Sequence, residues 1–351
     1  MSFVDSLSVL QRNLQPPFAM LSNYVAGAYL TSRVVCAVAE LGVADHLAAG
    51  PRSVDELASL TSSNPDALAR LLRAAASLGI FEETSKGTFK TNSMGQYLET
   101  DREGSMRAWA RYVGMPWNQE VWSHFMDSLR TGKDIYTVRH GHRFFEHFAQ
   151  NPEQGAMFDA GMRGLSTLSD EPIAAAYPFG KVKRVADIAG GLGGQLAAIL
   201  RRHEGVEGTL FDQASVIAGA KSIWESERAD LLHRASLQDG NFFERVPEHA
   251  DVYLLKSIIH DWEDEPAIGI LSNCARAMAS GGRVLVAELV IPEGNGAHFG
   301  KLLDMAMLAL TGGRERTEAE YASLFERSGL ELERIVSTAS PYSLIVGKAK
   351  R

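Results

Sequence analysis

Asp187-Ile188-Ala189-Gly190-Gly191-Leu192-Gly193-Gly194 is the segment that decides the fold of this chain. A short apolar stretch before it, Val185 to Ile188, predicts a buried strand, and the residues after it predict a helix that runs to His203. Glycines at such a junction let a ligand lie against the backbone, close to the free amides of the helix N-terminus. We therefore expect a strand–loop–helix unit whose loop is either a simple tight turn or a ligand site.

Strand and helix patterns alternate from about Val182 to the end of the chain. Further strands are predicted at Thr209–Phe211, Val252–Leu255, Val284–Val290, Leu330–Val336 and Tyr342–Val346. This alternation predicts a parallel sheet with helices on both faces, the doubly wound α/β class. Ligands of such sheets bind at the carboxyl ends of the strands.

The first third of the sequence predicts a winged-helix unit of three short helices and a hairpin. Thr31–Leu47 has helical spacing of apolar residues, Ser53 and Glu56 form a capping box, and Asn64-Pro65 starts a helix that Gly79 ends. Two short strands then flank Ser85-Lys86-Gly87. The next region, from about Ser105 to Leu168, is helical and rich in aromatic residues and methionine, some of which are expected to line an apolar pocket.

Charge argues against nucleic acid or membrane as a partner. The 351 residues include 35 Lys and Arg against 43 Asp and Glu, which gives a net charge of −8. The candidate DNA-recognition helix, Asp66 to Leu78, has only Arg70 and Arg73 as basic residues. We expect this helix to pack against another subunit or domain, and we keep a DNA-binding regulator as an alternative.

Two cysteines, Cys36 and Cys274, lie in apolar helical patterns, which suits a reducing compartment. No apolar run approaches the length of a transmembrane helix, and Met1–Asn13 lacks the basic start and apolar core of a secretory signal. We expect a cytoplasmic protein. No Cys/His spacing predicts a metal site.

Two acidic residues favour S-adenosylmethionine (SAM) over a nicotinamide dinucleotide. Asp212 ends the second strand, where a carboxylate can accept from both ribose hydroxyls. Asp187 immediately before the glycines would repel a pyrophosphate but attract the cationic groups of SAM. The dinucleotide fingerprint also fails, because Leu196 stands where its third glycine belongs.

Three residues are candidates for the reacting groups. His260 follows the strand Val252–Leu255, and Glu288 lies within an apolar strand, where an unpaired charge is costly. Glu315 precedes a helix, and its flanking arginines leave open an ordinary surface ion pair.

Six ordered motifs give a specific resemblance: DIAGGLGG, LFDQASVI, GNFFERVP, LKSIIHDWEDE, VLVAELVIP and GGRERTEAEY. In this order they resemble the plant-type small-molecule O-methyltransferases, the caffeate and hydroxyindole family that is also common in bacterial secondary metabolism. The resemblance implies a Rossmann-like SAM-binding domain behind a winged-helix dimerisation domain, and a homodimer. It implies methyl transfer to a hydroxylated aromatic, that is, phenolic or enolic, small molecule without a metal.

The resemblance also implies residue roles. His260 matches the general base, and Glu288 and Glu315 match the carboxylates that bracket it. The matching cofactor residues are Asp187, Gly190, Gly191, Gly193, Asp212, Asn241, Phe242 and Lys256. The expected acceptor contacts are Trp117, Trp122, Met162, Asp261 and Met307. Two positions depart from the family pattern: Ala189 replaces its first glycine, and Asn241 replaces the acidic residue beside the adenine.

We predict three parts: a dimerisation domain (1–104), a helical linker that lines the acceptor pocket (105–175) and the SAM-binding domain (176–351). The main alternative keeps the SAM-binding scaffold but catalyses hydroxylation, decarboxylation or rearrangement.

Overall fold

The computed structural model describes residues 16–350 and divides the chain into two compact units. The first unit runs to Trp122 and also contains Asn151–Leu165, whereas the second contains Ser123–Gln150 and everything from Ser166 onward. The region 105–175 therefore does not form a unit of its own and is shared between the two. The expectation that Met1–Asn13 is not a signal segment falls outside the described residues.

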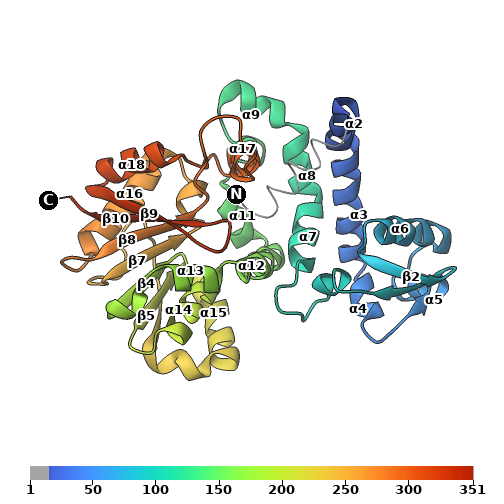
Figure 1. Cartoon of the computed structure of the whole chain (residues 1–351), viewed down its shortest axis with the longest axis horizontal. Helices are drawn as coiled ribbons and strands as arrows, with labels where there is room; N and C mark the ends of the chain where they lie inside the picture. The colour runs from blue at the N-terminus through green and yellow to red at the C-terminus, as the bar shows by residue number, and fades with distance from the viewer. Residues whose placement is uncertain (1–15, 351) are drawn as a thin grey trace. The chain divides into compact units, whose positions relative to one another are not determined.

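The first unit is a mostly helical winged-helix domain with a small sheet of strand order β1-β3-β2 (Figure 1). Its helices and strands are α2 (Pro17–Ser22), the π-helical turn η1 (Asn23–Gly27), α3 (Ala28–Glu40), α4 (Val43–Leu47), β1 (Arg52–Ser53), α5 (Val54–Leu60), α6 (Pro65–Ser77), β2 (Phe81–Ser85), β3 (Thr88–Thr91), the 3-10 turn η2 (Gly95–Leu98), α7 (Arg107–Gly114), α8 (Pro116–Ser123) and α12 (Pro152–Ser166). Its core contains the buried side chains Val38, Leu57, Leu72, Phe81 and Phe89.

The capping signals of this unit are confirmed. The helical pattern of Thr31–Leu47, however, is divided between α3 and α4, because Gly42 between them has a φ of +64°. The Glu56 amide donates to the Ser53 hydroxyl at 3.3 Å, and the Glu56 carboxylate accepts from the Ser53 amide at 2.7 Å. Asn64 caps α6 by accepting from an amide at 3.0 Å. Gly79 follows that helix with φ +75°, a conformation that favours glycine. The capping residues therefore predict where α5 and α6 begin, and Gly79 predicts where α6 ends.

The second unit is built on a seven-stranded sheet of order β6-β5-β4-β7-β8-β10-β9. The strands are β4 (Arg184–Ile188), β5 (Glu207–Asp212), β6 (Ala235–Asp239), β7 (Val252–Lys256), β8 (Arg283–Glu288), β9 (Leu330–Ser337) and β10 (Ser343–Ala349). The predicted parallel sheet is confirmed from β6 to β8, but the prediction is wrong for β10, which pairs antiparallel with both β8 and β9. The connection between β9 and β10 is too short for a parallel crossover, which needs a dozen or more residues.

Helices cover both faces of this sheet, which confirms the doubly wound class (Figure 1). The helices and 3-10 turns of the unit are α9 (Phe125–Thr131), α10 (Ile135–His140), α11 (Phe144–Gln150), α13 (Asp170–Ala176), η3 (Phe179–Lys181), α14 (Gly194–Arg202), α15 (Ala214–Glu227), η4 (Ala229–Arg234), η5 (Ile259–Asp261), α16 (Asp264–Ala277), α17 (Gly300–Leu310) and α18 (Glu318–Arg327). Helices α13, α14 and α15 pack on one face, with Leu196 and Trp224 in that core, and α16 and α18 pack on the other, with Ile270 and Phe325.

The parallel part of the sheet brings its carboxyl ends to one edge. Strands β4, β5, β7 and β8 end there at Ile188, Asp212, Lys256 and Glu288. The glycine segment follows β4, and the turn η5 with His260 follows β7. None of the helices between residues 16 and 350 is long and apolar enough to cross a membrane.

Candidate active site

The glycine segment after β4 is a tight turn that opens α14. Gly191 and Gly193 have φ angles of +58° and +78°, and a Cβ on Gly193 would lie 2.6 Å from the indole nitrogen of Trp224. Ala189 also has a positive φ, +51°, which strains a residue with a side chain. The departure at Ala189 is therefore a matter of backbone strain rather than of one extra methyl group. A Cβ on Gly191 would meet open space, so this backbone is accessible to a ligand.

Asp212 holds this turn from the end of β5. One of its carboxylate oxygens accepts from the Gly191 amide at 2.8 Å and the other from the Gln213 amide at 2.7 Å. Burial raises the pKa of Asp212, and the two amides partly oppose that shift. The predicted ribose-binding residue and the predicted glycine loop are thus in direct contact.

Asp187 is a buried carboxylate without a hydrogen-bond partner. Its side chain is 1% exposed, and neither oxygen is paired. Burial raises its pKa to about 7, Lys256 opposes that rise, and Asp170 and Asp212 add to it. The Leu196 amide also favours the ionised form but does not reach hydrogen-bonding geometry. An unpaired buried carboxylate fits a cationic ligand group.

Lys256, at the end of β7, is held by two residues that sequence reasoning missed. Its ammonium donates to the Ser166 hydroxyl at 2.7 Å and forms an ion pair with Asp170. Asp170 lies in the first turn of α13, where an acidic residue is common for the sake of the helix itself. No signal in the sequence pointed from that turn to Lys256.

Asn241 and Phe242 follow β6, next to Asp212, because the Gly240 amide donates to the Asp212 carbonyl at 3.0 Å. The Asn241 side chain is engaged within its own turn: it accepts from the Phe243 amide and donates to Glu244, each at 3.0 Å. The ring of Phe242 packs against Trp262. Asn241 therefore braces the turn beside Asp212.

His260 lies in the turn η5 and is buried, at 9% exposure. Its Nδ1 is 2.7 Å from Oε1 of Glu315, which is itself 3% exposed, so Glu315 is not a surface ion pair with its neighbouring arginines. Nε2 lies 3.9 Å from the Asp261 carboxylate.

Glu288 touches the backbone of this turn. Its Oε1 accepts from the amides of Ile258 and His260, each at 3.0 Å, and its Oε2 accepts from the Tyr321 hydroxyl. The expectation that two carboxylates bracket the His260 ring therefore needs correction: Glu315 contacts the ring, whereas Glu288 holds the main chain. An apolar strand accommodates Glu288 because all these donors converge on it.

Electrostatics in this cluster favour a bound proton. Burial alone would lower the pKa of His260, but Asp261, the hydrogen bond to Glu315 and the charge of Glu288 together raise it to about 10. Burial also raises the pKa of Asp261, to about 7, and that of Glu315. The His260 imidazole is thus a strong base surrounded by carboxylates.

The predicted acceptor residues fall into both units. Asp261 and the buried Met307 on α17 belong to the second, where α17 packs against α9 and α10. Trp117, Trp122 and Met162 belong to the first, and the Trp117 indole donates to Gln154 at 2.7 Å. Among residues 16–350 there is no group of three or more His, Cys, Asp or Glu side chains placed to hold a metal ion.

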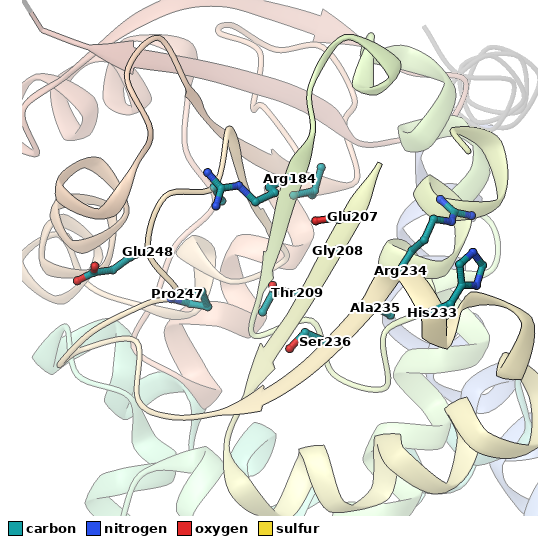
Figure 2. Close-up of a pocket in the computed structure, with 12 residues that line it drawn as sticks. Arg184, Glu207, Gly208, Thr209, His233, Arg234, Ala235, Ser236, Pro247 and Glu248 are labelled. Carbon is teal, nitrogen blue, oxygen red and sulfur yellow. The ribbon is translucent and has the colours of Figure 1, made fainter. Parts of the chain in front are cut away.

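A hollow of about 320 Å³ lies elsewhere, at the amino-terminal ends of β4, β5 and β6 (Figure 2). Arg184, Glu207, His233 and Arg234 are among its lining residues. The Arg234 guanidinium donates hydrogen bonds to the carbonyls of Leu200, His203 and Val206. The hollow lies at the opposite edge from His260, and parallel sheets bind their ligands at the carboxyl edge. We therefore place the candidate active site at the carboxyl edge of the sheet, which carries His260.

Comparison with known families decides the identity. The family model of an O-methyltransferase domain matches residues 122–331, and that of an O-methyltransferase dimerisation domain matches residues 24–101. The chain belongs to the O-methyltransferase family. It is a SAM-dependent O-methyltransferase, as the resemblance in its motifs predicted.

Relatives of this O-methyltransferase cover nearly its whole length. The phenazine O-methyltransferase PhzM of Lysobacter antibioticus is 37% identical over 94% of this chain and 96% of its own. The aclacinomycin 10-hydroxylase RdmB of Streptomyces purpurascens is 35% identical over 87% of this chain and 83% of its own. The solved structure of NcsB1, an O-methyltransferase of neocarzinostatin biosynthesis in complex with SAM and 2-hydroxy-5-methyl naphthoic acid, has a TM-score of 0.78 and 34% identity, and covers 91% of this chain and 96% of its own.

Proposed function

We propose that this O-methyltransferase methylates a hydroxyl of a flat phenolic or enolic secondary metabolite, with His260 as the general base. The observation that carries the proposal is the buried contact of 2.7 Å between His260 Nδ1 and Glu315 at the carboxyl edge of the sheet. Relatives named for phenazine and naphthoate substrates support an aromatic acceptor.

Glu315 directs the base. When its carboxylate accepts the Nδ1 proton of His260, the lone pair of the neutral ring stands on Nε2 and can take the acceptor's hydroxyl proton. Glu315 and Asp261 then stabilise the imidazolium that forms. Glu288 acts on the main chain of the same turn and is a positioning residue.

The residues of the glycine edge fit SAM. Asp187 offers an unpaired buried carboxylate for a cationic group, Asp212 lies beside an accessible glycine backbone, and Lys256 is held nearby by Asp170. Gly190, Gly193, Asn241 and Phe242 shape the same edge. When bound, SAM supplies a methyl group that its sulfonium activates. The chain's own residues orient the acceptor hydroxyl and remove its proton.

The residues proposed to contact the acceptor remain Trp117, Trp122, Met162, Asp261 and Met307.

A homodimer is proposed as well. The dimerisation-domain match supports it, and so do exposed apolar side chains between Pro17 and Glu40, among them Phe18, Val25 and Leu30. A cytoplasmic location stays a prediction from the low cysteine content.

Mass spectrometry of the purified protein with SAM and a panel of phenols tests the proposal. We expect an acceptor to gain one methyl group, and we expect His260→Ala to abolish that gain. His233→Ala, an exposed histidine at the opposite sheet edge, is the matched control and should keep the activity. An acceptor that gains an oxygen atom instead would favour the hydroxylase chemistry for which RdmB is named. Salt-dependent DNA binding without turnover would favour a regulator.

A further inference from the structure

Most main-chain amides and carbonyls of the turn that carries His260 have hydrogen-bond partners within the protein. On its amide side, Glu288 accepts from Ile258 and His260, and Tyr321 donates to Glu288. Within the turn, the Asp261 amide donates to the Ile258 carbonyl at 3.2 Å and the Trp262 amide to the Ile259 carbonyl at 3.3 Å. A buried turn needs partners on its carbonyl side as well.

Arg316 provides most of that carbonyl side. Its Nη1 donates to the Ile259 carbonyl at 3.0 Å and its Nη2 to the Trp262 carbonyl at 2.9 Å. The Arg314 amide donates to the carbonyl between them, that of His260, at 2.8 Å. One guanidinium therefore forms hydrogen bonds with the turn on both sides of His260.

The burial of Arg316 is unusual for an arginine. The side chain is 0% exposed, and its Nη2 forms an ion pair of 2.9 Å with Asp264, which is partly exposed. A buried guanidinium is costly, and stability alone is a weak reason to keep one. The same segment packs tightly against the turn, since a Cβ on Gly313 would lie 1.9 Å from the His260 carbonyl oxygen.

We propose that Arg316 is a positioning residue that sets the distance between the His260 ring and Glu315. Arg316 and Glu315 are adjacent in the chain, so the guanidinium ties the segment that carries Glu315 to the turn that carries His260. Loss of these hydrogen bonds from Arg316 lets the turn move away from Glu315. The contact of 2.7 Å between His260 Nδ1 and Glu315 then weakens. This inference rests on the proposed role of His260 as base.

Arg316→Lys is the test. Lysine keeps the charge but lacks the planar guanidinium that donates at once to two carbonyls and to Asp264. The first readout is titration of the His260 imidazole by NMR in the cofactor-free protein, with His260→Gln to assign the resonance. We expect its pKa to fall by about one unit or more, because the Glu315 hydrogen bond weakens. The second readout is methyl transfer: kcat falls about 10- to 100-fold while KM for SAM stays within about twofold.

Two further variants keep the test decisive. Asp264→Asn leaves Arg316 in place but removes its ion-pair partner, and we expect a smaller shift of the same sign in both readouts, even if Arg316→Lys fails to fold. Arg327→Gln removes an exposed arginine 3.9 Å from the other oxygen of Asp264 and should change neither. A folded Arg316→Lys, or an Asp264→Asn, with unchanged imidazole titration would overturn the proposal. Absence of methyl transfer in the wild type would instead count against the proposed function.

Discussion

Replacing Asp187 by asparagine separates the effect of this carboxylate on stability from its effect on SAM affinity. The side chain is buried, unpaired and close in space to Asp170 and Asp212, so its ionised form is disfavoured. Asparagine has nearly the same shape but no charge. We therefore expect Asp187→Asn to stabilise the cofactor-free protein and to weaken SAM binding.

The magnitude follows from the pKa. Burial raises the pKa of Asp187 from 3.8 to about 7. A difference of about 3 units at ~1.4 kcal/mol each makes ionisation cost the fold at most ~4 kcal/mol. The native state binds more protons than the unfolded state between these two values, so stability falls as pH rises from about 4 to about 7. An unpaired buried amide costs ~1–2 kcal/mol itself, which leaves a net gain of ~2–3 kcal/mol at about pH 8.

Urea unfolding at about pH 4.5 and about pH 8, with and without SAM, measures this. The gain should appear at the higher pH and nearly vanish at the lower one, and titration calorimetry should show weaker SAM binding. Asp230→Asn, at an exposed position, is the control. Equal free energies of unfolding for wild type and Asp187→Asn at both pH values would show that ionised Asp187 does not destabilise the fold, and undiminished SAM affinity would show that it does not bind the cofactor.

Three further predictions concern the turn and the base. Because the pKa of His260 is raised to about 10, kcat/KM should increase with pH up to that value, and Glu315→Gln should move this limb to lower pH; an unmoved limb would show that another group titrates. Glu288→Gln should reduce kcat less than Glu315→Gln, since its contacts are to main-chain amides; the reverse order in steady-state kinetics would contradict that assignment. Gly313→Ala should lower kcat by about 10-fold or more by displacing the His260 carbonyl, and an unchanged rate in a folded variant would speak against it.

Much of the fold was open to sequence reasoning because its signals are local. Capping residues set the helices around Ser53 and Asn64, and continuous apolar runs marked the buried strands β4, β7 and β8. Strand β6, Ala235–Asp239, was not predicted, because an edge strand with mostly exposed side chains has no such run. The direction of β10 was also hidden, since apolar pattern marks a strand but not its direction.

The site was less predictable because it depends on contacts between distant segments. Motif order brought His260, Glu288 and Glu315 together, yet only the structure separated a carboxylate on the ring from one on the backbone. Arg316 reads as a surface residue in Gly312–Thr317, although its side chain is fully buried. Asp170 is separated from Lys256 by 86 positions in the sequence.

The most direct measurement compares SAM binding with methyl transfer in His260→Gln. We expect the variant to bind SAM as the wild type does, because the His260 side chain contacts Glu315 and Asp261 rather than the proposed cofactor residues. We expect methyl transfer to fall by about 100-fold or more. Transfer at the wild-type rate by a folded His260→Gln would contradict the proposed role of His260, since the base would then be another group.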